Sequence, residues 1–153
     1  MFRKAESGVF VLLVHPGGPY WARKDLGAWS IPKGEYSEGD DPQAAALREF
    51  EEELGSRPAG SLVPLGTLLQ KGGKHVAAFA VEGELDPAAI VSNSFEMEWP
   101  PRSGRRQRFP EVDRAEWFGL QEARKRILQS QRPFLDRLAE LIGAEPAAGH
   151  PGT

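Results

Sequence analysis

The chain has 153 residues, of which 40% are hydrophobic and 27% charged, a balance typical of one globular domain rather than a disordered chain. It contains no cysteine, which excludes disulfides and thiolate-ligated metal sites, and its formal net charge of −3 argues against general nucleic-acid binding. No apolar run approaches the roughly 20 residues that span a bilayer, and the first four residues lack the apolar stretch of a signal peptide. We therefore expect a cytoplasmic protein that binds neither membranes nor nucleic acid.

The first half of the chain predicts a strand, loops and a helix. An apolar, β-branched run indicates a strand over residues 7–15, followed by a loop rich in Pro and Gly. A short extended piece at residues 29–32 precedes a loop rich in Gly and acidic residues at 33–40. A helix should begin after the N-cap Asp41, which a proline follows, and should end at Gly55.

The middle of the chain predicts three more strands. Two of them, residues 62–70 and 75–81, are joined by a segment with a Gly-Gly turn signal. A third is expected within residues 90–99, where apolar and polar side chains alternate. The basic stretch 102–108 is expected to be a loop.

The last part predicts a short strand at residues 115–118 and then one broken or two short helices over 121–142, interrupted near Pro133. We expect a single domain over residues 1–143 and a flexible C-terminal tail over 144–153.

Three glutamates in the predicted helix form an unusual cluster. Glu49, Glu52 and Glu53 stand at positions i, i+3 and i+4 and share one helical face, while Phe50 and Leu54 belong to another, apolar face. Like charges at this spacing repel, and the helix dipole disfavours them near the C-terminus. A divalent cation would offset both effects, and magnesium prefers such oxygen ligands. The alternative is a solvated acidic surface.

The surrounding residues favour the metal. Gly34 is followed after five residues by Asp40 and after seven more by residues 48–55, R-E-F-E-E-E-L-G. This spacing resembles the Nudix box, whose pattern is G-x5-E-x7-R-E-U-x-E-E-x-G-U with U an apolar residue. The match runs over residues 34–56, with Asp40 in place of the first glutamate and Ser56 in place of the last apolar residue. The resemblance extends over about residues 7–141 and is closest to small bacterial Nudix proteins.

The resemblance implies an α/β fold, the Nudix α/β/α sandwich with a mixed β-sheet. The family normally has a strand before the one expected at residues 7–15, and only residues 1–4 remain for it here. A truncated first strand would leave an open sheet edge and favour dimerisation, so a monomer and a homodimer are both open.

The resemblance also implies magnesium-dependent hydrolysis of a diphosphate linkage, with manganese as the alternative ion. By position, Glu49, Glu52 and Glu53 would be the metal ligands, and Gly34 would contribute a backbone carbonyl near the ion. Arg48 would orient one of these glutamates by an ion pair.

Two glutamates are candidates for the general base. Glu52 is the first choice within the box. Glu111 is the best distant candidate, as base or further metal ligand. The alternative interpretation is that Glu111 is only a loop carboxylate in an ordinary turn. Glu96 and Glu98 are weaker candidates, since strand alternation could equally place them in solvent.

Residues outside the box bear on the substrate. The segment 29–34, W-S-I-P-K-G, resembles the sequence before the box in dinucleoside polyphosphate hydrolases, and diphosphoinositol polyphosphate hydrolases have a related one. Basic residues that could meet a phosphate chain are Lys33, Lys71, Lys74, Arg102, Arg105, Arg106 and Arg108. The alternative to a phosphate-binding role for the arginines is that they are solvated or contact an acidic partner.

Aromatic residues could read a base. Tyr20 and Trp21 are candidates for base stacking, with a half-buried loop anchor as the alternative. Three other tryptophans, Trp29, Trp99 and Trp117, are expected in the core. The histidines show no ligand spacing, and we assign them no role.

The favoured function is hydrolysis of a dinucleoside polyphosphate or a related nucleotide. Two alternatives are a diphosphoinositol polyphosphate hydrolase and a non-catalytic nucleotide-binding sensor. A scaffold that makes protein contacts through the arginines is a third.

Overall fold

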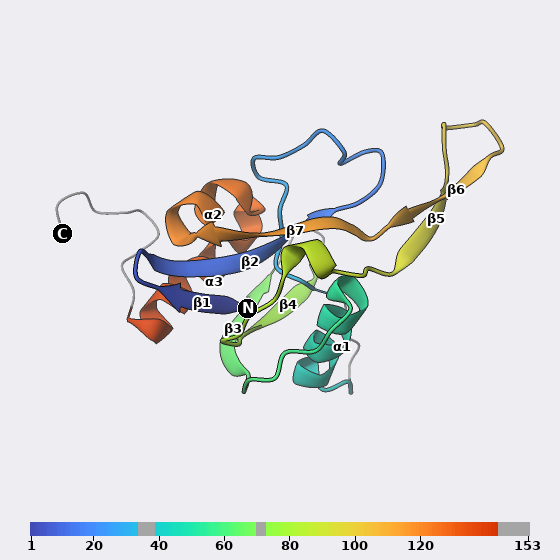
Figure 1. Ribbon diagram of the computed structural model, residues 1–153. Coiled ribbons are helices and arrows are strands. Elements are labelled where there is room, and N and C mark those ends of the chain that lie inside the picture. Colours follow the sequence, from blue (N-terminus) through green and yellow to red (C-terminus); the bar gives the residue numbers. More distant parts are fainter. Residues whose placement is uncertain (34–38, 70–72, 144–153) are drawn as a thin grey trace.

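The computed structural model describes residues 1–33, 39–69 and 73–143 (Figure 1). In chain order the elements are β1 (Phe2–Ala5), β2 (Gly8–Pro16), α1 (Pro42–Leu54), β3 (Val63–Leu69), β4 (His75–Ala80), the 3-10 turn η1 (Pro87–Ala89), β5 (Ser94–Glu98), β6 (Arg106–Pro110), β7 (Val112–Gly119), α2 (Leu120–Arg126), the 3-10 turn η2 (Gln129–Gln131) and α3 (Arg132–Ile142). None of the helices in these ranges is long and apolar enough to cross a membrane.

The strands form three antiparallel groups. The central group has the order β1-β2-β7, and β3–β4 and β5–β6 form two hairpins. Parallel pairing enters through the isolated bridges Phe2↔Glu82 and Trp29↔Ile127. In Figure 1 the β5–β6 hairpin projects from the body of the molecule, while the other strands lie among the helices.

The two faces of β2 pack against different helices, which makes the layers of a sandwich. Val11 and Leu13 belong to one buried cluster, which includes residues of α2 and α3. Leu12 and Val14 belong to a second cluster, with Phe50 and Leu54 of α1. Since side chains alternate along a strand, α1 and the α2–α3 pair must cover opposite faces of the sheet. This arrangement confirms the predicted α/β/α sandwich.

β1 is short but fully integrated. Its four residues pair with β2 from Phe2↔Val11 to Ala5↔Gly8, and the Phe2 side chain is buried. The Phe2 N–H donates to the Val81 carbonyl, and the Gly83 N–H donates to the Phe2 carbonyl. The segment after β4 therefore covers the outer edge of β1 at Phe2, so the expectation of an open edge is wrong at this position.

The predicted ends of α1, the helix that carries the box glutamates and is called the box helix below, are confirmed. The Asp41 carboxylate accepts a hydrogen bond of 3.2 Å from the Gln43 N–H, so that it caps the first turn of α1. Gly55 adopts the left-handed conformation with φ of 87°, and its N–H donates to the Glu51 carbonyl. The C-terminal break is also confirmed: α2 ends at Arg126, and Pro133 lies in the first turn of α3 rather than in the break.

The prediction of a basic loop over residues 102–108 is wrong in part. Arg106 and Arg108 lie in β6, where they stand opposite Glu98 and Glu96 of β5. Cross-strand pairs of opposite charge stabilise the pairing of β5 with β6. The run of arginines alone gives no sign of this strand in the sequence.

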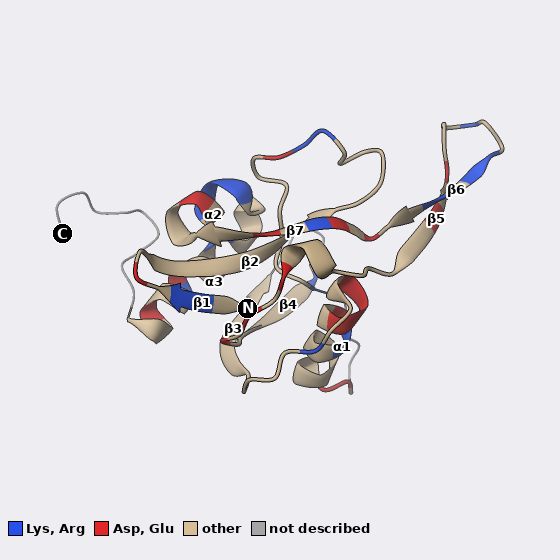
Figure 2. Ribbon diagram, in the orientation of Figure 1, with Lys and Arg blue, Asp and Glu red and all other residues tan. Residues whose placement is uncertain are grey.

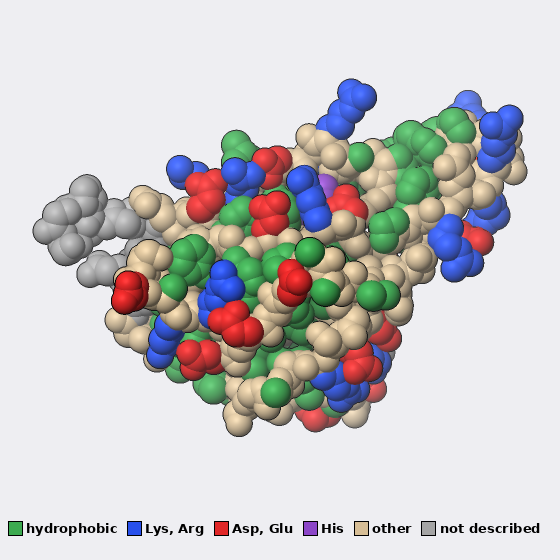
Figure 3. Space-filling view, in the orientation of Figure 1, with side chains coloured by type: hydrophobic (Ala, Val, Ile, Leu, Met, Phe, Trp, Pro, Cys, Tyr) green, Lys and Arg blue, Asp and Glu red, His purple; other side chains and the backbone are tan. Residues whose placement is uncertain are grey.

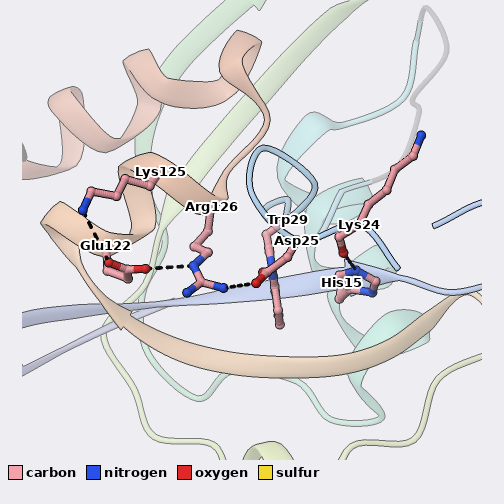
Figure 4. A network of polar contacts seen from close by, with 7 residues as sticks. All are labelled: His15, Lys24, Asp25, Trp29, Glu122, Lys125 and Arg126. Carbon is pink, nitrogen blue, oxygen red and sulfur yellow. Dashed lines mark hydrogen bonds and ion pairs between the residues drawn. The ribbon is translucent and has the colours of Figure 1, made fainter. Parts of the chain in front are cut away.

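A buried histidine fixes the long loop between β2 and α1 (Figure 4). The His15 side chain is 0% exposed, its Nε2 donates to the Lys24 carbonyl at 2.6 Å, and its Nδ1 lies 2.8 Å from Asp113 Oδ1. His15 thus has a structural role, which the sequence analysis did not assign. The spacing of 98 residues between His15 and Asp113 gives no local sequence signal for it.

The same loop is held a second time at Asp25. The Trp29 indole donates to the Asp25 carboxylate at 2.8 Å, and the Arg126 guanidinium pairs with it as well (Figure 4). These hydrogen bonds from Trp29 and Arg126 lower the pKa of Asp25. The loop segment that carries Tyr20 and Trp21 is therefore anchored to β2 through His15 and to α2 through Arg126.

Candidate active site

The acidic face of α1 is built on a buried apolar face. Phe50 and Leu54 anchor the helix, and Glu49, Glu52 and Glu53 are half-buried beside them. The neighbouring Glu51 is exposed instead and forms an ion pair of 2.9 Å with Arg57. Acidic residues dominate the end of α1 that lies nearest to η1 in Figure 2.

The electrostatics of this face are strained. Burial is the main cause that raises the pKa of Glu53 to about 8, and the nearby Glu49 and Glu111 contribute in the same direction. The Lys33 N–H opposes this shift by donating to Glu53 Oε2 at 2.8 Å. Burial also raises the pKa of Glu49, as do Glu52 and Glu111, while Arg48 lowers it. Glu49 therefore interacts electrostatically with Glu52 and Glu111, and Glu53 interacts with Glu49 and Glu111.

A chain of backbone hydrogen bonds places Glu111 beside α1. The Asn93 N–H donates to the Glu52 carbonyl at 2.8 Å, and the Glu111 N–H donates to the Asn93 carbonyl at 2.8 Å. The Glu111 carbonyl then accepts from the Gly17 N–H at 2.9 Å. The box helix, the segment before β5, Glu111 and the loop after β2 are therefore positioned relative to one another. The sequence could not identify Asn93, because its contribution is made by backbone groups.

The donor chemistry fits a hard divalent cation. The pKa values of Glu49 and Glu53 are raised partly by neighbouring carboxylates, which indicates an excess of negative charge, and oxygen ligands are those that Mg²⁺ prefers. Across residues 1–33, 39–69 and 73–143, no three Asp, Glu or His side chains are close enough to form a ready-made ion site. Gly34, the expected backbone ligand, lies outside the described residues.

The basic residues divide into two groups. Lys33 is next to Glu53, and the Arg48 guanidinium lies 3.8 Å from the Glu49 carboxylate. The hairpin arginines are elsewhere: Arg106 and Arg108 contact Glu96, at 3.7 and 3.4 Å, and Figure 2 shows the basic residues toward the far end of the hairpin.

The other predicted basic residues lie away from α1 in the chain or outside the described residues. Arg102 and Arg105 are exposed at the turn of the hairpin. Lys74 is exposed immediately before β4, and Lys71 lies outside the described residues. Glu96 and Glu98 are exposed on β5, in agreement with the alternative that strand alternation places them in solvent.

A pocket of about 320 Å³ adjoins Glu111. Loop residues 16–21 form one side, and Phe95 and Met97 of β5 form the other. Neither of these two residues was predicted to belong to the site, although their alternation with exposed residues was the available signal. Another cavity, of about 100 Å³, lies among mostly apolar side chains near β2, β4 and α1, and we assign it no role.

The three tryptophans predicted to lie in the core occupy three different environments. Trp29 is 1% exposed and belongs to the core, as predicted. Trp117 is half-buried and packs against the second cluster. The prediction for Trp99 is wrong, because this half-buried residue lies at the end of β5 and meets Tyr20 edge-on, with 5.2 Å between ring centroids.

Gly17 is expected to be intolerant of a side chain. A Cβ atom there would lie 1.9 Å from the Pro110 carbonyl oxygen, so Gly17→Ala must separate the loop from Glu111 and should lower the free energy of unfolding by about 1–3 kcal/mol. Gly119→Ala is the control, since its Cβ meets nothing closer than 4.0 Å and only the N-cap of α2 changes, at about 0.5 kcal/mol. Urea unfolding of both variants measures this, and equal losses would contradict the close approach at Gly17.

Comparisons with known proteins agree with this architecture. A model of the NUDIX domain matches residues 1–138. An RNA pyrophosphohydrolase from Rhodospirillum rubrum is 40% identical over 57 residues, which are 35% of this chain and 34% of that protein. The chain thus aligns with about a third of the length of that relative.

Two solved structures show the same fold. A C. elegans Ap4A hydrolase in a binary complex superposes with a TM-score of 0.63 at 20% identity, over 93% of both chains. The NUDIX domain of Shewanella oneidensis NrtR, complexed with ADP ribose, superposes with a TM-score of 0.60 at 17% identity, over 92% of this chain and 82% of that one. With the family model matched over most of its length, the chain belongs to the NUDIX domain family.

Proposed function

We propose that this chain is a pyrophosphohydrolase that cleaves a diphosphate linkage in a nucleotide, with a dinucleoside polyphosphate as the leading substrate. The observation that carries the proposal is the electrostatic influence of Glu52 and Glu111 on the half-buried carboxylates Glu49 and Glu53 of α1, with Glu111 at the edge of a pocket with aromatic walls. The name of the C. elegans neighbour, an Ap4A hydrolase, agrees with the substrate class.

The carboxylates of α1 are the proposed holders of Mg²⁺, or of Mn²⁺ as an alternative. When bound, the ion supplies charge neutralisation for the phosphate oxygens and lowers the pKa of the attacking water. Glu49 and Glu53 are partly desolvated, so that they would hold a cation more firmly than exposed carboxylates do. The Lys33 N–H orients the Glu53 carboxylate through its hydrogen bond, and the Lys33 ammonium is available to a phosphate.

The remaining chemistry is the removal of a proton from water. We assign it to Glu52, which shares a hydrogen bond with Glu49 and whose own carbonyl is tied to Asn93. Glu111 is the second candidate, as base or further ligand, because its charge raises the pKa of both Glu49 and Glu53. Arg48 is assigned to orienting Glu49 rather than to contact with substrate.

A sensor is the second candidate function. The NrtR domain has this fold and is seen with ADP ribose, so the fold alone is compatible with nucleotide binding. A pure binder has no requirement for neighbouring carboxylates that raise the pKa of Glu49 and Glu53, and this favours the enzyme. The scaffold alternative predicts no metal dependence.

The test is a turnover panel with magnesium. The substrates are diadenosine polyphosphates, nucleoside triphosphates, ADP-ribose, diphosphoinositol polyphosphates and a short RNA with a 5′-triphosphate. We expect one nucleotide class to be cleaved, with a loss of at least about 100-fold when the ion is removed by EDTA and recovery when magnesium is restored. Binding without turnover would favour the sensor, and turnover that is unchanged in EDTA would contradict the proposed mechanism.

A further inference from the structure

The pocket beside Glu111 has two walls of different origin. Residues 16–21, which include Tyr20 and Trp21, form the loop wall. Phe95 and Met97, on the half-buried face of β5, form the strand wall. Figure 3 shows hydrophobic side chains along the projecting β5–β6 hairpin, with the basic ones gathered at its far end. An apolar surface of this kind is usual where a ligand or partner binds.

The two walls are held together by close contacts. A Cβ atom on Gly18 would lie 3.0 Å from Phe95 Cζ, so Gly18 of the loop contacts the tip of the Phe95 ring. The Gly17 N–H donates to the Glu111 carbonyl, and His15 holds the far end of the loop at the Lys24 carbonyl. The pocket is therefore formed before any ligand arrives, which lowers the ordering cost of binding.

The lining specifies the chemistry of the occupant. It contains one carboxylate, Glu111, and no lysine or arginine, so that a phosphate chain would find no cation there. Aromatic rings and a methionine sulfur suit a flat, neutral ring system. The volume of about 320 Å³ is at the small end of ligand pockets, which fits a single ring system.

We infer that this pocket binds the base of the nucleotide substrate, with Phe95 as its stacking platform and the phosphates running past Glu111 toward α1. The inference rests on the proposed function and narrows it. A nucleotide has an aromatic ring that can stack on Phe95 within this pocket, whereas an inositol polyphosphate has none. The pocket thus favours a nucleotide over a diphosphoinositol substrate.

The test measures binding apart from turnover. Adenosine and guanosine 5′-monophosphates are titrated into the metal-free protein by calorimetry, with ribose 5-phosphate as the probe that lacks a base. We expect Phe95→Leu, which keeps apolar volume but removes the ring, to weaken nucleotide binding by about 10-fold. Phe10→Leu is the matched control, since Phe10 is also half-buried but lies on β2 against Arg3.

The outcomes separate this inference from the proposed function. Weaker nucleotide binding by Phe95→Leu than by the Phe10→Leu control supports the base pocket, whether or not the wild type turns over any substrate. Equal affinity for a nucleotide and ribose 5-phosphate, or no change in Phe95→Leu, overturns it. Thermal unfolding of both variants checks that folding is intact. In an active enzyme, Phe95→Leu should raise KM and leave kcat within about twofold.

Discussion

Glu52→Gln is expected to lower kcat by about 10³-fold, within the range of 10²–10⁴ typical of a lost general base. The amide keeps the shape of the side chain but can neither accept the proton from water nor neutralise a cation. The matched control is Glu51→Gln, because Glu51 is the preceding residue of the same helix and is exposed in an ion pair with Arg57. We expect this control to keep kcat within about twofold of the wild type. Steady-state rates at saturating magnesium and substrate are the measurement.

A parallel Glu111→Gln variant distinguishes the two candidate bases. If Glu52 removes the proton, Glu111→Gln should lose less activity than Glu52→Gln and should partly recover at high magnesium concentration. A larger loss in Glu111→Gln, without recovery, would transfer the role of base to Glu111. Activity above about a tenth of wild type in Glu52→Gln would contradict both its assigned roles.

The box helix could be predicted in detail because its signals are local. Asp41 and Gly55 mark its two ends through their own backbone preferences, and the spacing of the glutamates fixes their common face. The apolar face with Phe50 and Leu54 could be read in the same way. These features depend on residues a few positions apart, so a single sequence contains them.

The surroundings of the helix could not be predicted, because they depend on distant pairings. The place of Glu111 is set by backbone groups of Glu52, Asn93 and Gly17, and a backbone hydrogen bond leaves no trace in residue type. His15 and Asp113 meet across 98 positions. The arginine-rich stretch reads as a loop because like charges obscure a strand that is stabilised by glutamates on its partner.

Phe95 and Met97 are an intermediate case. Their alternation with Ser94, Glu96 and Glu98 predicts a strand with one apolar face, and the structure confirms it. What that face contacts depends on the path of the loop at residues 16–21, which the sequence marks only as a break in regular structure. The local sequence pattern thus predicts which face of a strand is apolar, whereas the residues that this face contacts are known only from the tertiary structure.

The stability of the metal-free protein is expected to fall as pH rises from about 5 to 8. The pKa of Glu53 is raised from 4.5 to about 8 in the folded state, chiefly by burial. Between these values the folded state retains a proton that the unfolded state has released, so the free energy of unfolding decreases with pH. The contribution is fully present below pH 4.5 and is lost as pH rises through 8. With allowance for partial exposure, the loss is about 3 kcal/mol.

Glu53→Gln isolates this contribution, because the amide oxygen can still accept from the Lys33 N–H but has no charge to desolvate. Urea unfolding in EDTA at pH 5, 6, 7 and 8 should show the wild type losing stability relative to Glu53→Gln, while Glu51→Gln follows the wild type. Parallel curves for wild type and Glu53→Gln would contradict a buried, protonated Glu53. Magnesium should reverse the trend in the wild type and have a smaller effect on Glu53→Gln, because a cation stabilises the ionised carboxylate that burial penalises. The feature that destabilises the empty fold at neutral pH is then the one that binds the ion.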